Sequence, residues 1–147
     1  MAKETLEGIE IKPYIKKHFS SEKEMCNFIE DNIDLFSMQI LGSKLISYVR
    51  EYKFFNGTRK GASVDFFIKT EIGDFFIECK NTNSFNDLCG AIGQCLCYIS
   101  LGKSQGDKAK MFLITSNYHS ILVQSIKDNN LDIQLVVFNK EHSLFLL

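Results

Sequence analysis

Two short runs of aromatic and β-branched residues, 62–69 and 74–80, flank a polar turn that contains Gly73. Runs of this composition are typical of strands that are buried on at least one face. We therefore expect the two runs to pair as a β-hairpin. The hairpin also carries the most informative charged residues of the chain, because Asp65 lies on its first arm and Glu78 and Lys80 on its second.

The position of the turn decides which of these charged side chains meet. Side chains alternate across a strand, so Glu78 and Lys80 point to the same face. A two-residue turn at 71–72 places Asp65 opposite Glu78, and a turn at 72–73 places it opposite Lys80. A three-residue loop would put Asp65 on the other face unless a bulge intervened. In either two-residue register the three charged groups lie within roughly 5–8 Å of one another, among Phe and Ile side chains. Charges in such a place are costly unless they are paired or bind a metal.

Length and composition limit the classes of protein that the chain can belong to. At 147 residues, with 45% hydrophobic and 24% charged residues, it is expected to form a single soluble domain over 1–147, with residues 1–20 as an N-terminal extension. The net charge of −1 means that a nucleic-acid surface would have to be a local patch. No apolar run approaches the ~20 residues of a membrane span, and the N-terminus lacks a signal-peptide pattern. We therefore expect a cytoplasmic protein with no membrane partner.

The cysteines and histidines do not follow a zinc-binding pattern. The chain has 5 cysteines and 3 scattered histidines, without a Cys-x-x-Cys pair. Reduced, buried thiols in a cytoplasmic protein are the simplest interpretation.

Helical and strand patterns follow one another along the rest of the chain. Ser21 and Glu24 form a capping-box pattern that opens a helix. The apolar residues of this helix at helical spacing are Met25, Phe28, Ile29, Ile33 and Phe36. A strand is expected over 44–55, ahead of the hairpin. A second helix is expected over 87–101, with Leu88, Ile92, Cys95, Leu96 and Ile99 on its apolar side.

The last part of the chain alternates between strand and helix. A short apolar strand is predicted over 110–115, a helix over 118–129 and a final strand over 133–138. The element order is α-β-β-β-α-β-α-β. This order predicts the α/β class, with a mixed sheet and helices on both faces.

These residues resemble the PD-(D/E)XK nuclease superfamily, whose fold is a restriction-endonuclease-like α/β sandwich. The matching residues are Val64-Asp65, Glu78-Cys79-Lys80 and, on the following helix, Gln94 and Tyr98. The resemblance extends from about residue 20 to residue 139 and includes the order of the elements. Val64 stands where the name of the superfamily has a proline.

The resemblance and the chemistry of phosphodiester cleavage imply a role for each matching residue. Asp65 and Glu78 would bind a divalent ion, and hard carboxylate ligands favour Mg²⁺, with Mn²⁺ as a substitute. The resemblance implies the backbone carbonyl of Cys79 as a further ligand, with its side chain in the core. Lys80 would orient or deprotonate the attacking water, or stabilise the developing negative charge.

Four further positions are candidates for contacts with the water or the substrate. Glu22 and Glu24 compete as an additional acidic residue, and helical phase favours Glu22 because Glu24 already serves the capping box. Gln94 and Tyr98, four residues apart, could hydrogen-bond the substrate phosphate or the water.

Arg59 and Lys60, in the loop before the first arm of the hairpin, are candidates for binding nucleic-acid phosphates. The function predicted first is a Mg²⁺-dependent endonuclease that acts on DNA and selects it by structure or through a partner. A homodimer would supply two cuts. The alternative is a catalytically silent nucleic-acid-binding or assembly module on the same fold. The sequence does not distinguish DNA from RNA as the substrate.

Overall fold

The structure is a computed structural model that describes residues 19–54, 62–117, 119–138 and 144–146. Within these residues, one sheet contains six strands in the order β1-β2-β3-β4-β5-β6. The strands are β1 (Leu45–Lys53), β2 (Ser63–Thr70), β3 (Gly73–Lys80), β4 (Lys110–Thr115), β5 (Ile133–Phe138) and β6 (Leu144–Leu146). The pairs β1-β2, β2-β3 and β5-β6 are antiparallel, whereas β3-β4 and β4-β5 are parallel. The sheet is therefore mixed, as predicted.

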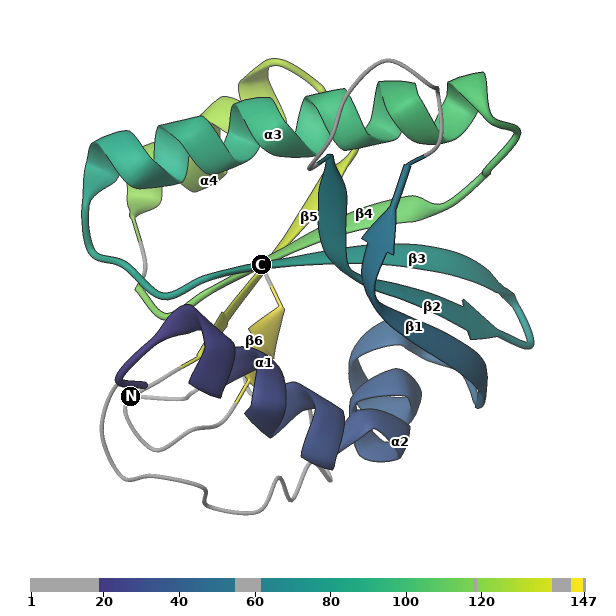
Figure 1. Ribbon diagram of the computed structural model, residues 1–147. Coiled ribbons are helices and arrows are strands. Elements are labelled where there is room, and N and C mark those ends of the chain that lie inside the picture. Colours follow the sequence, from purple (N-terminus) through teal and green to yellow (C-terminus); the bar gives the residue numbers. More distant parts are fainter. Residues whose placement is uncertain (1–18, 55–61, 118, 139–143, 147) are drawn as a thin grey trace.

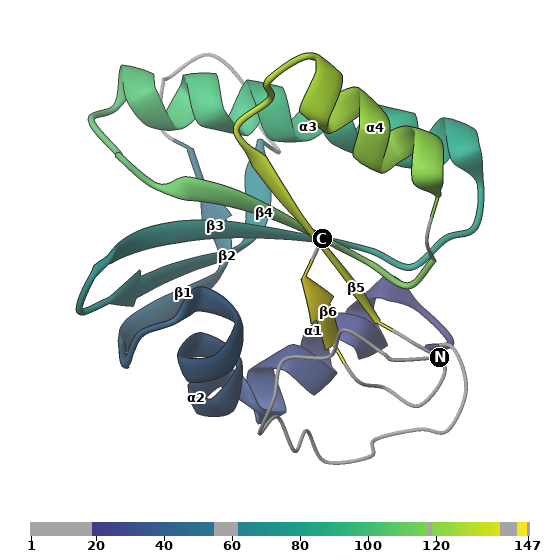
Figure 2. The same cartoon turned by 180° about the vertical axis from the view of Figure 1, so that it is seen from behind.

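Helices cover both faces of the sheet, as Figure 1 and, from behind, Figure 2 show. One face carries α1 (Glu22–Asp31), the short α2 (Ile33–Phe36) and the π-helical turn η1 (Ser37–Leu41). The other face carries α3 (Phe85–Ser104) and α4 (Ser120–Asp128). The predicted order of elements is confirmed, with α2, η1 and β6 as additions. None of the helices in the described ranges has the length and hydropathy that crossing a membrane requires.

The hairpin of β2 and β3 has the first of the two predicted registers. Thr70 lies opposite Gly73 and Phe66 opposite Ile77, so the chain turns at 71–72. The Thr70 hydroxyl donates a hydrogen bond to the Gly73 carbonyl (2.8 Å) and accepts one from the backbone N–H of Ile72 (3.3 Å). Gly73 has a φ of +151°, which glycine adopts without the steric cost of a Cβ atom. These contacts hold the register on which the position of Asp65 depends.

Alternating side chains of the hairpin fill two separate cores. Phe66 and Ile68 pack toward α1, whereas Phe67 and Phe76 pack toward α3. All four are at most 5% exposed. Truncating a buried aromatic side chain to alanine typically costs about 3–5 kcal/mol. The hairpin is therefore anchored between the two helical layers.

Helix α1 starts as predicted but ends earlier. The Ser21 hydroxyl accepts a hydrogen bond from the backbone N–H of Glu24 (3.1 Å), which confirms the cap. The chain leaves the helical conformation at Asn32 (φ −120°), so the predicted apolar stripe is divided between α1 and α2. The Asn32 side chain donates to the Phe28 carbonyl (2.9 Å), so it satisfies the carbonyl that a continuing helix would have used.

Helix α3 is longer than predicted at both ends and buries a different stripe. Its buried residues are Leu88, Ala91, Cys95, Tyr98 and Gly102. Leu96, which was expected on the apolar side, is 40% exposed. The buried positions recur at the three- and four-residue steps of one helix face, which Leu96 does not share. Hydrophobicity alone therefore misassigned Leu96.

Candidate active site

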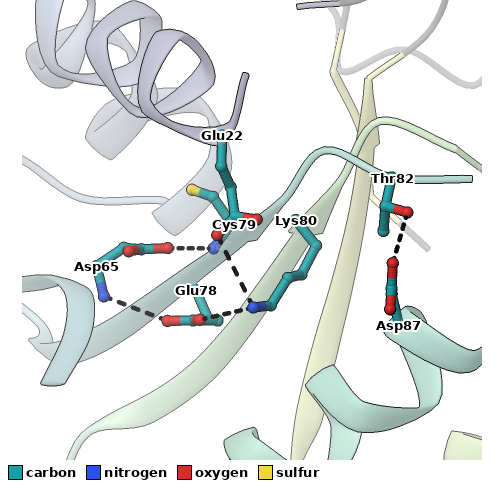
Figure 3. A network of polar contacts seen from close by, with 7 residues as sticks. All are labelled: Glu22, Asp65, Glu78, Cys79, Lys80, Thr82 and Asp87. Atoms are coloured by element: carbon teal, nitrogen blue, oxygen red, sulfur yellow. Dashed lines mark hydrogen bonds and ion pairs between the residues drawn. The ribbon is translucent and has the colours of Figure 1, made fainter. Parts of the chain in front are cut away.

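The ladder between β2 and β3 gives way to side-chain contacts at the open end of the hairpin. Regular pairing runs from the turn to Phe66 and Ile77. One residue further, the Asp65 carboxylate accepts a hydrogen bond from the backbone N–H of Cys79 (2.8 Å), and the Glu78 carboxylate accepts one from the backbone N–H of Asp65 (3.3 Å), as Figure 3 shows. These two hydrogen bonds take the place of backbone-to-backbone hydrogen bonds between the strands. They also fix the positions of the two carboxylates.

The pleat of β1 and β2 is interrupted at the same level. Val64 packs toward α3 and Phe66 toward α1, although residues two apart on a regular strand share a face. In β1, Glu51 has a φ of +57°, and it separates Tyr48 on the α1 side from Tyr52 on the α3 side. A non-glycine residue in this conformation costs of order 1–3 kcal/mol. Asp65 lies at the interruption, where its carboxylate reaches the backbone of β3.

Lys80 connects the hairpin to the first turn of α1. Its ammonium nitrogen lies 3.6 Å from a carboxylate oxygen of Glu78 and 3.8 Å from one of Glu22. The Glu78 side chain is 5% exposed and that of Lys80 18%, whereas that of Glu22 is 45% exposed. One buried carboxylate and one more accessible carboxylate therefore share a single ammonium group (Figure 3).

Oxygen atoms of Glu22, Asp65 and Glu78 all lie within 4.8 Å of one another. Hard oxygen donors in this arrangement suit Mg²⁺ or Mn²⁺. Burial, followed by the negative charge of Asp65, raises the pKa of Glu78 to about 8. Burial also raises the pKa of Asp65 and of Glu22. The raised pKa values mean that ionising all three carboxyl groups beside the single Lys80 ammonium is unfavourable without further positive charge, and a divalent cation fits this donor set.

The two candidates for the additional acidic residue are separated by the geometry. Glu22 contributes to the acidic cluster and contacts Lys80. The Glu24 carboxylate instead accepts a hydrogen bond from the Ser20 hydroxyl. The geometry therefore supports Glu22, the residue favoured by helical phase.

A pocket of about 570 Å³ opens beside this cluster. Glu22 and Asp65 line it together with Cys26, Arg50 and Glu51. The sequence did not single out the last three residues. The positive φ of Glu51 gives no signal in a strand pattern, and Arg50 pairs with Glu30 (2.7 Å) across the α1 face. A second pocket of about 650 Å³, near Phe75 and Ile133, contains none of the clustered carboxylates, so volume alone does not identify the site.

Several solved structures are similar to this chain. A repair endonuclease from Pyrococcus abyssi matches with a TM-score of 0.51 and 16% identity over 81% of this chain. An XisH family protein from Nostoc punctiforme matches with a TM-score of 0.50 and 11% identity, covering 79% of this chain and 96% of the other. The chain has the restriction-endonuclease-like fold.

The predicted fold class is thus confirmed, whereas the similarities leave the activity open. The chain spans only 47% of the repair endonuclease. The small subunit of the heterodimeric restriction endonuclease R.BspD6I matches with a TM-score of 0.47 and 16% identity, over 80% of this chain and 72% of that subunit. No protein-family model matches the sequence, and no match was found among curated proteins.

Within this fold, the remaining predicted site residues lie in different surroundings. Cys79 is fully buried, and burial, followed by its hydrogen bond with Cys26, raises its pKa well above the ordinary value for a thiol. Its side chain is in the core, as expected, and a ligand role for its carbonyl stays a prediction. Arg59 and Lys60 lie outside the described residues.

Gln94 and Tyr98 do not share one environment. Tyr98 is 8% exposed, and its ring stacks on Phe54 with centroids 5.6 Å apart. Burial, followed by the charges of Glu78 and Asp65, raises the Tyr98 pKa. Gln94 is exposed, and in the described part of the chain no hydrogen bond joins it to the site carboxylates. Packing explains Tyr98, and the substrate contacts of both residues stay predictions.

Proposed function

We propose that the protein is a Mg²⁺-dependent phosphodiesterase that cleaves DNA endonucleolytically, with Mn²⁺ as a substitute ion. The observation that carries the proposal is the meeting of Glu22, Asp65 and Glu78 oxygens within 4.8 Å. Lys80 lies beside this cluster, in contact with two of the three carboxylates. An ion-binding acidic cluster with an adjacent ammonium group can act on a phosphodiester, which carries a negative charge.

Asp65 and Glu78 would hold the ion, with Glu22 as a third carboxylate and the Cys79 carbonyl as a further ligand. When bound, the ion supplies positive charge for the scissile phosphate and lowers the pKa of a nearby water. Lys80 contacts Glu78 and Glu22, and we expect its ammonium group to orient a water or to stabilise negative charge that develops in the transition state. Gln94 would contact the phosphate or the water from the exposed side of α3.

The charge distribution bears on the substrate. Because the net charge is only −1, we expect weak general attraction to DNA. Arg59 and Lys60 would supply local phosphate contacts, with Tyr98 near the site. Selection by DNA structure, or through a partner or a second copy of the chain, would then provide specificity. All five cysteines are free thiols, which fits the cytoplasmic location that we also propose.

The matched pair Glu22→Gln and Glu24→Gln tests this function on a single turn of α1. Labelled linear and branched DNA would be incubated with purified protein in Mg²⁺, in Mn²⁺ or in EDTA. We expect Glu22→Gln and Lys80→Met to slow cleavage by about 100-fold or more, because each removes a charge at the reacting centre. Glu24→Gln should retain the wild-type rate, because its carboxylate binds Ser20 instead.

Cleavage that persists in Glu22→Gln and Lys80→Met would point to a contaminating nuclease and remove the proposal. Tight binding of DNA without cleavage in either metal would favour the silent binding module. Matched RNA strands in the same assay would decide between the two nucleic acids.

A further inference from the structure

A second group of ligating atoms lies directly beside the acidic cluster. The sulfur atoms of Cys26 and Cys79 and a carboxylate oxygen of Asp65 all lie within 4.8 Å of one another. The two thiols are hydrogen-bonded, and they are 5% and 0% exposed. The proposed cleavage uses neither sulfur. Asp65 therefore belongs to two sets of ligands, one made of oxygen alone and one that contains two sulfurs.

The second set differs from the first in the ions that it prefers. Thiolates bind Zn²⁺ and its soft analogue Cd²⁺ far better than they bind Mg²⁺. Tetrahedral zinc with Zn–S bonds of about 2.3 Å places two sulfur ligands about 3.8 Å apart. Two sulfurs and one oxygen already within 4.8 Å of one another approach that geometry, and water can take the fourth position.

The pocket provides a route for an ion to this group. Cys26 and Asp65 both line the pocket of about 570 Å³ that opens beside α1, together with Glu22. Two cations, Lys23 and Arg50, also line the pocket, but the Arg50 guanidinium group is paired with Glu30 at 2.7 Å, and the carboxylates of Glu22, Glu51 and Asp65 outnumber the two cations. An ion can therefore approach Cys26 and Asp65 without opening the core around Cys79.

We propose that Cys26, Cys79 and Asp65 form an inhibitory site for a thiophilic divalent cation, of which Zn²⁺ is the biological example. Binding displaces the two thiol protons to solvent and engages an oxygen of Asp65. The bound ion withdraws this oxygen from the Mg²⁺ ligands and places a second divalent charge beside them. The pairwise spacing that suggests zinc sites in a sequence is absent here, because Cys26 comes from α1 and Cys79 from β3. The inhibition rests on the proposed function, whereas the binding does not.

Direct metal binding tests the site without any need for enzymatic activity. Zn²⁺ affinity would be measured by competition with a chromogenic chelator, and thiolate ligation by the ultraviolet charge-transfer absorption of bound Cd²⁺. We expect Cys26→Ser to weaken Zn²⁺ binding by more than about tenfold, since even outer-shell changes cost 10–100-fold in metal affinity. Cys89→Ser, which alters an exposed thiol on α3, is the matched control and should retain the wild-type affinity and absorption.

The second measurement is inhibition by Zn²⁺ in excess Mg²⁺, expressed relative to the rate of each variant without Zn²⁺. Wild type and Cys89→Ser should be inhibited at the Zn²⁺ concentrations that saturate binding, and Cys26→Ser only at concentrations more than tenfold higher. Circular dichroism would verify folding, and Cys26→Ala is the second variant if serine disturbs it. Equal Zn²⁺ affinity in wild type and both Cys26 variants would overturn the site. Cleavage of DNA without Cys26-dependent Zn²⁺ binding would overturn the site and leave the proposed function standing. Absence of cleavage would remove the proposed function and the inhibition, and the Zn²⁺-binding data would still decide whether the site exists.

Discussion

Replacing Glu78 with glutamine should stabilise the metal-free protein at alkaline pH. The pKa of Glu78 is raised from 4.5 to about 8, by burial first and then by the charge of Asp65. The folded state therefore holds this proton more tightly than the unfolded chain does. As the pH rises from 4.5 toward 8, ionisation of Glu78 favours unfolding, and the loss of stability is complete above about 8.

The size of the effect follows from the two pKa values. A tenfold change in proton affinity is worth about 1.4 kcal/mol, so a change from 4.5 to about 8 corresponds to at most about 5 kcal/mol. Glutamine has a similar shape, carries no charge and can still accept the hydrogen bond from the backbone N–H of Asp65. We therefore expect Glu78→Gln to exceed wild type by about 2–5 kcal/mol near pH 9 and to match it near pH 5.

Urea denaturation in EDTA at several pH values between 5 and 9 would measure this difference. Glu71→Gln, at an exposed position in the turn of the same hairpin, is the matched control and should follow wild type throughout. Adding Mg²⁺ should reverse the order, because only wild type retains the full set of carboxylates and gains stability from bound ion. The reasoning would be refuted if wild type and Glu78→Gln had the same dependence of stability on pH in EDTA.

Two further predictions concern the packing of α3 and use urea denaturation as the measurement. A Cβ atom at Gly102 would lie 2.8 Å from the ring of Phe76, so Gly102→Ala should destabilise the fold by about 1–3 kcal/mol. A Cβ atom at Gly90 would meet no neighbouring atom within 4 Å, so Gly90→Ala should be neutral or stabilise the fold by up to about 1 kcal/mol. Equal stabilities of these two variants would contradict the close approach. Tyr98→Phe should retain the stack on Phe54 and cost little, whereas Tyr98→Ala should cost about 3–5 kcal/mol. Loss of DNA binding in a stable Tyr98→Phe protein would instead assign the hydroxyl to the substrate.

The hairpin was predictable because its signals are local. With the alternation of the arms, a two-residue turn at 71–72 or at 72–73 places Asp65 opposite Glu78 or Lys80, and only a three-residue loop would have moved it to the other face. The early end of α1 was not predictable, because Asn32 interrupts a stripe that is otherwise continuous. The change of face at Glu51 and Asp65 was also hidden, because it depends on a left-handed backbone at a glutamate in a strand. Cys26 and Cys79 meet only through tertiary packing, so their spacing in the chain carried no information.

The hydrogen bond from the backbone N–H of Cys79 to the Asp65 carboxylate bears on the choice of an inactive protein for trapping a nucleic-acid complex. Alanine at position 65 would remove the acceptor and leave a buried amide unsatisfied, at a cost of about 1–3 kcal/mol. Asparagine keeps an oxygen for that amide while discarding the negative charge. We therefore expect an Asp65→Asn protein to keep the wild-type conformation of the hairpin in a complex with its substrate. In an alanine variant, the end of β3 would lose the hydrogen bond that attaches it to β2 at this position.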